Sequence, residues 1–295
     1  MRPAFETLTL NIEGLQVAGI RHRDASLDND VRMLCLHGWL DNAASFLPLM
    51  PYLPAIDMVA IDLPGHGYSA HAPKGISGGY SLFDYASTAH RVMDALGWQT
   101  CHLAGHSLGG CIAPIVAVGA SERIPSLITI DAAGPLSEDP AGTPARIARA
   151  MQDRLSPERF SSRLFKTRDA AVDARLAATK MARTSAKLII DRQLREAEDG
   201  GFRWRFDPAL RYSSPQYFSE EQVHALLGAV TCPSLSVVAD DGFLSNRDNT
   251  AERLACYKDH LTVELSGQHH LHMDTPEPVA AAINAFLGTR PALGG

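Results

Sequence analysis

Short apolar runs recur along the chain, and most are followed by a turn and then by a stretch with helical spacing. The runs are four to six residues long and do not alternate with polar residues, which is typical of strands buried on both faces of a parallel sheet. Residues 5–12 and 15–22 alternate loosely around Gly14 and predict a β-hairpin at a sheet edge. The predicted buried strands lie at residues 31–36, 58–61, 101–104, 127–130, 235–239 and 261–265.

Helical patterns fill the intervals between these strands. Apolar residues recur at helical spacing in residues 82–96, and a second helix is expected at 276–287, where Pro276 suits the first turn. Strands alternating with helices predict an α/β fold with a mostly parallel sheet flanked by helices.

One long stretch interrupts this rhythm. From residue 136 to 228 the chain is rich in Ala, Arg and Leu with helical spacing and shows no clear strand. We therefore predict a core formed by residues 1–135 and 229–295, interrupted by a mainly helical cap at 136–228. The tail at 289–295 is expected to fray.

The composition is that of a globular protein. Of the 295 residues, 45% are hydrophobic and 20% are charged, and the formal net charge of −6 argues against a nucleic-acid partner. Residues 144–200 carry 13 Lys and Arg against 8 Asp and Glu, so the predicted cap is basic while the rest of the chain is acidic. Such an excess is typical of solvated helix faces, and it would also attract anionic substrates.

The five cysteines occur singly, and Cys35 and Cys101 fall inside predicted buried strands. This pattern predicts neither a disulfide framework nor a zinc site, and it favours a reducing compartment. Residues 1–10 lack the features of a signal peptide, and no apolar run approaches the ~20 residues of a membrane span. We expect a cytoplasmic protein with no membrane partner, and a homodimer stays open.

The strongest chemical signal is Gly-x-Ser-x-Gly at residues 105–109, which follows a predicted strand and precedes an apolar helix. This context makes a short motif specific for a nucleophile elbow. A sharp turn would expose the hydroxyl of Ser107, and Gly105 and Gly109 would let the turn pack closely on its neighbours. Backbone N–H groups at the helix start would face developing negative charge.

Four motifs together resemble the α/β-hydrolase superfamily, and within it the group called serine hydrolase-like proteins. They are His-Gly-Trp-Leu-Asp-Asn at 37–42, Asp-Leu-Pro-Gly-His-Gly-Tyr-Ser at 62–69, the elbow at 105–109, and Gln-His-His-Leu-His at 268–272. The resemblance covers nearly the whole chain and implies the α/β-hydrolase fold, with the cap lying over Ser107 as a lid. It also implies that residues 62–69 form a structural turn, with His66 structural rather than catalytic.

A serine hydroxyl needs a base within hydrogen-bonding reach, and histidine suits this role because its pKa lies near neutrality. In this fold the base follows the last strand, and the resemblance favours His269, with His270 as the alternative. His272 is expected to support the loop. His269 and His272 could share a helical face as metal ligands, but no third ligand occurs at a recognisable spacing, so we predict no metal.

An oxyanion needs two fixed donors. The backbone N–H of the residue after the nucleophile, Leu108, is expected to be one of them. The resemblance implies that the backbone N–H of Trp39 is the second, with the Trp39 ring lining the pocket. No cofactor is implied, because side chains supply the chemistry.

The acid departs from the common pattern of the family. Many relatives carry an Asp about three residues past a Gly at the end of the strand before the last, whereas here residues 238–243 read Val-Ala-Asp-Asp-Gly-Phe. Asp241 lies 28 residues before His269 and is favoured. Asp131, which follows Ser107 by 24 residues at a strand end, is a known alternative location in this fold, and Asp240 is the third candidate.

A Ser-His-Asp triad with two amide donors transfers an acyl group to water through an acyl-enzyme. Ser107 excludes those relatives that use Asp at the elbow, such as haloalkane dehalogenases and epoxide hydrolases. We therefore expect a serine hydrolase of a small carboxylic ester or thioester. Two alternatives stay open, a non-hydrolytic lyase on the same triad and a ligand sensor with a retained triad. Apolar cap residues are expected to face the substrate, among them Phe160, Leu164, Phe165 and Met181.

Overall fold

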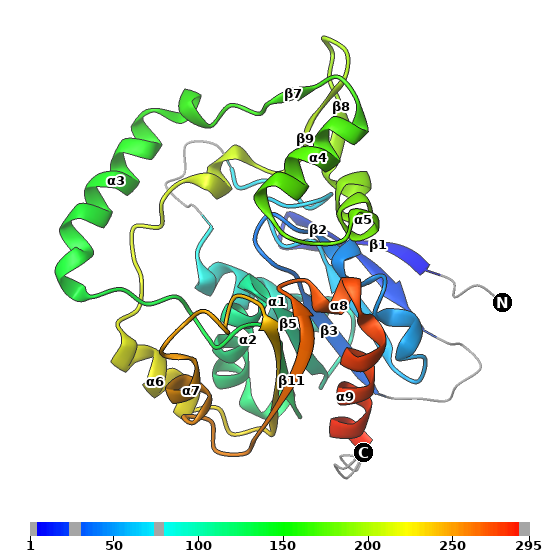
Figure 1. Cartoon of the computed structure of the whole chain (residues 1–295), viewed down its shortest axis with the longest axis vertical. Helices are drawn as coiled ribbons and strands as arrows, with labels where there is room; N and C mark the ends of the chain where they lie inside the picture. The colour runs from blue at the N-terminus through cyan, green and yellow to red at the C-terminus, as the bar shows by residue number, and fades with distance from the viewer. Residues whose placement is uncertain (1–4, 24–30, 74–79, 289–295) are drawn as a thin grey trace.

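A central eight-stranded sheet organises the computed structural model, which describes residues 5–23, 31–73 and 80–288 (Figure 1). The predicted tail at 289–295 lies outside the described residues. The strand order is β1-β2-β4-β3-β5-β6-β10-β11, and the α/β class predicted from the sequence is confirmed. The strands are β1 (Phe5–Ile12), β2 (Leu15–His22), β3 (Arg32–Leu36), β4 (Asp57–Ile61), β5 (His102–His106), β6 (Leu127–Ile130), β10 (Ser234–Asp241) and β11 (His260–Gln268).

The sheet is antiparallel at one edge and parallel elsewhere. β1 and β2 form the predicted hairpin, and β2 pairs antiparallel with β4. All remaining neighbours, from β4 through β3, β5, β6 and β10 to β11, pair in parallel. The run at 261–265 was expected to be buried on both faces, but β11 is an edge strand with one neighbour, so Leu261 is 44% exposed.

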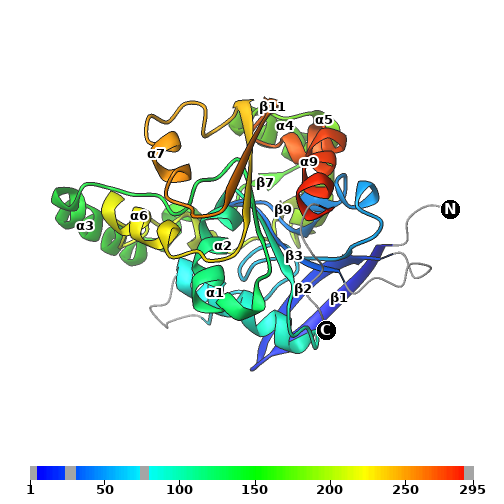
Figure 2. The ribbon, with the colours of Figure 1, turned by 90° about the horizontal axis from the view of Figure 1, so that it is seen from below.

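Helices cover both faces of this sheet. Alternate residues of β3 point to opposite sides: Leu34 packs in the cluster that contains α1 and α2, whereas Met33 packs in the cluster that contains α9. Figure 2 shows α1 and α2 on one side of the strands and α9 on the other. The helices are α1 (Leu82–Ala95), α2 (Leu108–Gly119), α3 (Thr143–Leu155), α4 (Arg168–Ala178), α5 (Arg183–Gln193), α6 (Glu220–Gly228), α7 (Thr250–Leu254), α8 (Leu271–Asp274) and α9 (Pro276–Gly288).

The strand order reverses between β3 and β5. After β3 the chain forms β4 on one side of it, and it then crosses to form β5 on the other side. In open α/β sheets, ligands bind beyond the carboxyl ends of the strands at such a switch point. The motif at 37–42 follows β3 and the elbow follows β5, so the topology places both at this point.

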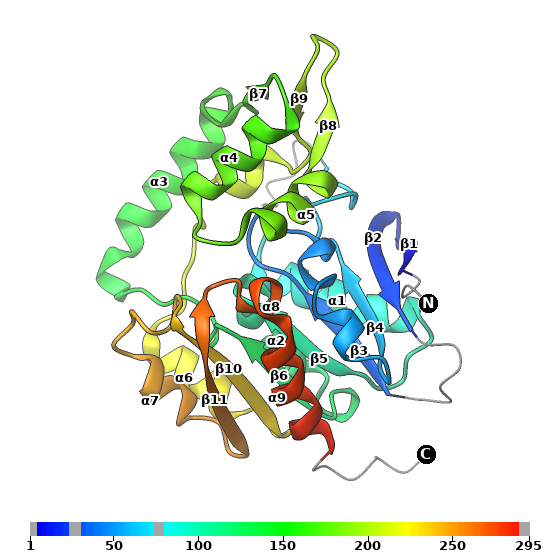
Figure 3. The same cartoon turned by 45° about the vertical axis from the view of Figure 1, so that its right-hand side comes forward.

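The predicted cap, residues 136–228, contains α3, α4, α5 and α6 together with a small sheet that the sequence did not predict. The first three of these helices and the small sheet lie at the upper end of the molecule in Figures 1 and 3. Two or three residues are too few for a hydrophobic period to be recognised, which is why these strands were missed. The small sheet has the order β7-β9-β8, formed by β7 (Leu164–Phe165), β8 (Leu194–Glu196) and β9 (Phe202–Trp204).

Several cap residues pack against one another. Phe165 and Ile190 are buried in a small cluster, and Met181 and Trp204 pack against it. Phe165 and Met181 were predicted to face the substrate, but both pack in a small core within the cap. Short helices and strands must bury their apolar faces against one another to be stable, and this cluster does so for the cap.

Two buried ion pairs join the cap to the core. Arg175 of α4 contacts Asp41, and Arg192 of α5 lies 2.8 Å from Asp62. Both carboxylates are buried, so these two arginines are neither part of a solvated helix face nor available to attract substrates. Breaking such a pair by removing one partner leaves an uncompensated charge in the interior, which is strongly destabilising.

The ends of the cap are fastened to the core by a third arginine. The buried Arg253 of α7 donates to the backbone carbonyls of Ala133 and Pro135, just before the cap begins. It also donates to Glu220 of α6, near the end of the cap. One guanidinium therefore holds both ends of the inserted segment together.

Two further predictions concern the membrane and the cysteines. Over the described residues, no helix has both the length and the apolar character that crossing a bilayer requires. Each of the five cysteines is free; Cys35 is buried in β3 as expected, and Cys101 is buried directly before β5.

Candidate active site

The elbow at Ser107 has a strained backbone that its glycines make feasible. Ser107 lies between β5 and α2 with φ of 51° and ψ of −112°, in a region that residues other than glycine rarely adopt. A Cβ at Gly109 would overlap the carbonyl of Leu36 in β3, and a Cβ at Gly105 would overlap the backbone of Gly109. The motif therefore needs glycine at both places, and the Ser107 side chain is left half-buried.

His269 follows β11 and pairs with a buried carboxylate. Its Nδ1 lies 2.6 Å from Oδ2 of Asp131, which follows β6. Because a carboxylate accepts hydrogen bonds, Nδ1 carries the proton, and Nε2 is the ring nitrogen left to act as a base. Asp131 also accepts from the backbone N–H groups of Phe243 at 2.6 Å and Leu244 at 3.4 Å.

The structure therefore brings Asp131 to His269, and not Asp241 or Asp240. Asp241 is exposed, lies 3.3 Å from the side-chain amide of Gln268, and faces Lys180 at 3.7 Å. Asp240 is also exposed and accepts from the backbone N–H of Gly267.

The backbone around β10 explains why Asp241, the candidate favoured by the sequence, is not beside His269. The register with β11 shifts between Ala239 and Asp241, and a turn follows at once. The carboxylate of Asp131 enters the space beside this turn, where a Cβ at Gly242 would lie 2.5 Å from its Oδ2. The turn after β10 therefore supplies N–H groups that donate to Asp131, and it does not supply the carboxylate that pairs with His269.

His269 lies beside the residue that precedes Ser107. The ring of His106, the residue directly before Ser107, is 4.7 Å from the ring of His269 between centroids. Within the described residues, no hydrogen bond joins Ser107 to His269. Such bonds are often loose before a substrate binds and tighten in the reacting complex.

The two predicted oxyanion donors come from the elbow and from the loop after β3. Leu108 is the first residue of α2, where a helix offers no internal acceptor to its N–H. Trp39 lies in a turn closed by the hydrogen bond from Asp41 N–H to the carbonyl of Gly38. The Trp39 ring is 52% exposed, and its Nε1 donates to the carbonyl of Leu210 in the cap.

Comparison with known proteins identifies the family to which this fold belongs. The family model of the α/β hydrolase fold matches residues 31–276. The chain belongs to the α/β-hydrolase fold family.

Relatives narrow the family to the serine hydrolase-like group. A serine hydrolase-like protein of Danio rerio is 30% identical over 86% of this chain and 81% of its own length. A hypothetical protein of Pseudomonas aeruginosa PAO1 has a similar solved structure, with 30% identity and a TM-score of 0.89 over 96% of this chain and 99% of its own. The thioesterase domain from the curacin biosynthetic pathway shares the fold, with 24% identity and a TM-score of 0.80 over 95% and 99% of the two chains. These comparisons support a hydrolase.

Two buried histidines fix the loop after β3 in this α/β hydrolase. Nδ1 of His37 donates to the carbonyl of Gly38, and its Nε2 accepts from the N–H of Leu63. His66 accepts from the N–H of Leu40, which has a φ of 59° in the left-handed region. Burial lowers the pKa of His37 to about 4 and that of His66 to about 3, so both are neutral near pH 7.

A cluster of buried groups near Ser107 and His269 was not predicted from the sequence. Asp41 lies 3.1 Å from Nε2 of His270 and 3.7 Å from Nδ1 of His106, and it contacts Arg175. Although burial raises the pKa of Asp41, Arg175 and His270 hold it well below its usual range. Burial also lowers the pKa of His106 and of His272 well below the usual value. The only signal in the sequence was that Asp41, His106 and His270 belong to the same motifs as Trp39, Ser107 and His269.

The donor set at this cluster resembles a metal site in composition. In the described part of the chain, Asp41, His106 and His270 form a buried group whose ligand atoms lie within 4.8 Å of one another. The charge of Asp41 is already compensated by Arg175, so a divalent cation would add uncompensated positive charge to the interior. We therefore assign these residues to an ion-pair network.

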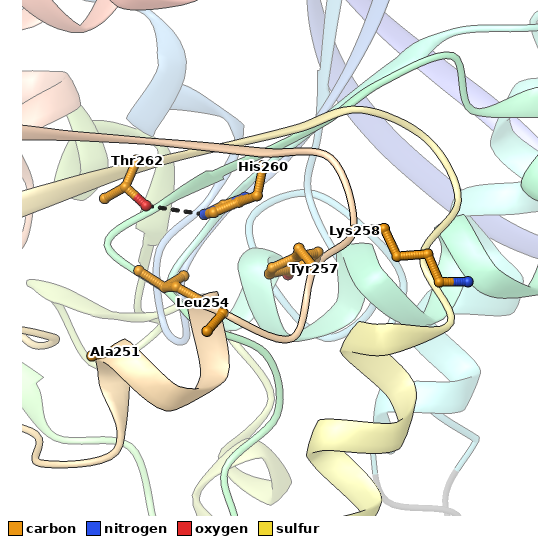
Figure 4. Close-up of a pocket in the computed structure, with 7 residues that line it drawn as sticks. Ala251, Leu254, Tyr257, Lys258, His260 and Thr262 are labelled. Carbon is orange, nitrogen blue, oxygen red and sulfur yellow. Dashed lines mark hydrogen bonds between the residues drawn. The ribbon is translucent and has the colours of Figure 1, made fainter.

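A hollow elsewhere on the surface is separate from this site. It lies between α7 and the start of β11 (Figure 4), at the opposite end of the parallel strands from Ser107. Neither Ser107 nor His269 lines it. Its lining residues are Ala251, Leu254, Ala255, Tyr257, Lys258, His260 and Thr262.

We expect the free energy of unfolding to fall as the pH drops from about 6.5 towards about 4. Unfolded histidines bind protons near pH 6.5, whereas the lower pKa values of His37 and His66 keep both neutral in the folded protein. Below about pH 6.5 the unfolded state therefore binds more protons, and stability is lost as the pH falls through this window. Urea denaturation between about pH 7.5 and pH 4.5 measures the trend.

Two variants serve as controls for this titration. His66→Gln keeps an acceptor for the N–H of Leu40 and should reduce the slope with pH, whereas His71→Gln at an exposed position should keep it. An unfolding free energy that stays constant across the whole range would contradict the assignment.

Proposed function

We propose that this α/β hydrolase is a serine hydrolase that cleaves a carboxylic ester or thioester of a small molecule through Ser107, His269 and Asp131. The observation that carries the proposal is the hydrogen bond from His269 to the buried Asp131 beside a strained elbow. Each residue comes from the carboxyl end of a different parallel strand. Strain at a non-glycine residue is typical of functional sites, where the surrounding structure compensates its cost.

The reaction begins with attack by the hydroxyl oxygen of Ser107 on the carbonyl carbon. Nε2 of His269 accepts the hydroxyl proton, and Asp131 stabilises the imidazolium without taking a proton itself. The carbonyl oxygen becomes an oxyanion, which accepts hydrogen bonds from the backbone N–H groups of Leu108 and Trp39.

Collapse of the tetrahedral intermediate breaks the bond to the leaving group. The departing alkoxide or thiolate takes the proton from Nε2 of His269, which leaves an acyl group on Ser107. Water then attacks this acyl-enzyme while His269 accepts its proton. The carboxylic acid is released, and Ser107 regains its hydrogen from His269.

We expect the protein to hydrolyse short-chain p-nitrophenyl esters or the matching thioesters, and Ser107→Ala to lower turnover to the level of the buffer. The reason is that this substitution removes the nucleophile while leaving the α2 helix in place. Ser245→Ala, at an exposed serine near the site, is the matched control and should retain activity. Turnover that persists in a folded Ser107→Ala variant would exclude the proposed nucleophile.

Asp131→Asn should lower kcat by about 10³- to 10⁴-fold, because an amide cannot stabilise the imidazolium and favours the wrong tautomer of His269. Asp240→Asn and Asp241→Asn are matched controls, since both carboxylates are exposed and neither contacts His269. Steady-state kinetics on one ester would compare the three variants. Equal losses in all three, or a larger loss in Asp241→Asn, would refute the assignment of the acid.

A further inference from the structure

Asp41 lies buried where four functional segments meet. It follows Trp39 by two residues, and it faces His106, which precedes Ser107, and His270, which follows His269. Its fourth neighbour is Arg175, which comes from α4 in the cap. One carboxylate of the loop after β3 therefore faces the elbow, the base loop and the cap.

Two hydrogen bonds hold the base loop, and Asp41 accepts one of them. Nε2 of His106 lies 2.8 Å from the backbone carbonyl of His269, and because a carbonyl only accepts, the nitrogen donates. Nε2 of His270 lies 3.1 Å from Oδ2 of Asp41, and the carboxylate accepts. The ring of His269 is held separately by Asp131. The main chain and the next side chain are thus fixed by groups that do not touch the reacting atoms.

The ion pair with Arg175 explains how a carboxylate can stay charged in this place. Asp41 is 1% exposed, and an isolated ionised carboxylate in such surroundings is very costly. Arg175 contacts its other oxygen, Oδ1, and leaves Oδ2 for His270. The charge state of Asp41 therefore depends on the position of α4 against the core.

We propose that Asp41 is a positioning residue that holds the His269 loop in place relative to Ser107. It does so only while Arg175 pairs with it and holds α4 of the cap against the core. The proposal rests on the proposed function, because it assigns His269 as the base. It adds that the cap contributes to the geometry of the base through an ion pair. A displacement of about 1 Å in a reacting group is enough to cost about 10²-fold in rate.

The pair of Asp62 and Arg192 offers a matched control. It is also a buried ion pair between the core and the cap, and it is equally shielded from solvent. The Asp62 carboxylate accepts from the backbone N–H groups of Ala43 and Tyr68, and no contact joins it to the His269 loop among the described residues. Loss of this pair should therefore weaken the attachment of the cap to the core without a direct effect on His269.

The test compares Asp41→Leu, Arg175→Met and the double variant with the double variant of Asp62→Leu and Arg192→Met. Each is measured for thermal unfolding, for kcat and KM on one ester, and for the low-field proton signal of the His269 Nδ1–H. That signal is assigned by its loss in Asp131→Asn, and its exchange rate reports how firmly the imidazole is held, independently of any turnover.

The single variants should unfold at lower temperature, because each leaves one buried charge without its partner. The Asp41→Leu/Arg175→Met variant should recover much of that stability, since both charges are gone. It should still lose about 10²-fold in kcat with little change in KM, and its His269 proton should exchange at least about tenfold faster. The control double variant should keep the His269 signal of the wild type.

A double variant at Asp41 and Arg175 with wild-type kcat and a wild-type His269 signal would overturn the proposal. If the leucine variants do not fold, Asp41→Asn decides the question, because it keeps an oxygen that can accept from His270 but removes the charge that pairs with Arg175. A His269 exchange rate that is unchanged in both Asp41→Asn and Arg175→Met would refute the proposal, because neither variant keeps the ion pair with the cap. A wild type without ester turnover would refute the proposed function, whereas the His269 signal would still test the positioning.

Discussion

The close contact between the elbow and the end of β3 is the constraint on which the site depends. Gly109 lies so near the carbonyl of Leu36 that no Cβ would fit, and its N–H donates to the carbonyl of His37. This contact brings Ser107 beside the loop that carries Trp39. Both proposed oxyanion donors are thereby set by backbone geometry, before any side chain of the substrate pocket is considered.

Buried aspartates bring together the other residues of the site and of the cap from distant parts of the chain. Asp131 accepts hydrogen bonds from His269 and from N–H groups of the turn after β10. Asp41 pairs with His270 and Arg175, and Asp62 pairs with Arg192. A charge without partners is unstable in the interior, so each carboxylate requires that its partners be present. The same requirement that orients His269 thus also joins the cap to the core.

The fold and the elbow could be predicted from the sequence because their signals are local. Buried strands are short apolar runs, and Gly105, Ser107 and Gly109 carry the turn within five residues. The edge position of β11 and the short strands of the cap were not predicted, because neither is encoded in a hydrophobic period. The cap boundaries at 136 and 228 remain a prediction from composition.

The carboxylate that pairs with His269 could not be chosen from the sequence, because chain separation does not fix where a strand ends in space. Asp241 has a suitable distance from His269 along the chain, but the register shift at the end of β10 leaves it exposed. Asp131 is adjacent to His269 because β6 lies beside β10 and ends under the same turn. Arg175 was likewise hidden among the basic residues of the cap, since only its burial beside Asp41 distinguishes it.

The most direct test of the central claim is to treat the protein with a fluorophosphonate and to locate the adduct by peptide mass spectrometry. A nucleophile activated by His269 and Asp131 should give one adduct per chain, on Ser107, and labelling should disappear in Asp131→Asn under the same conditions. An adduct on another residue, or a folded protein that remains unlabelled, would contradict a Ser107–His269–Asp131 triad.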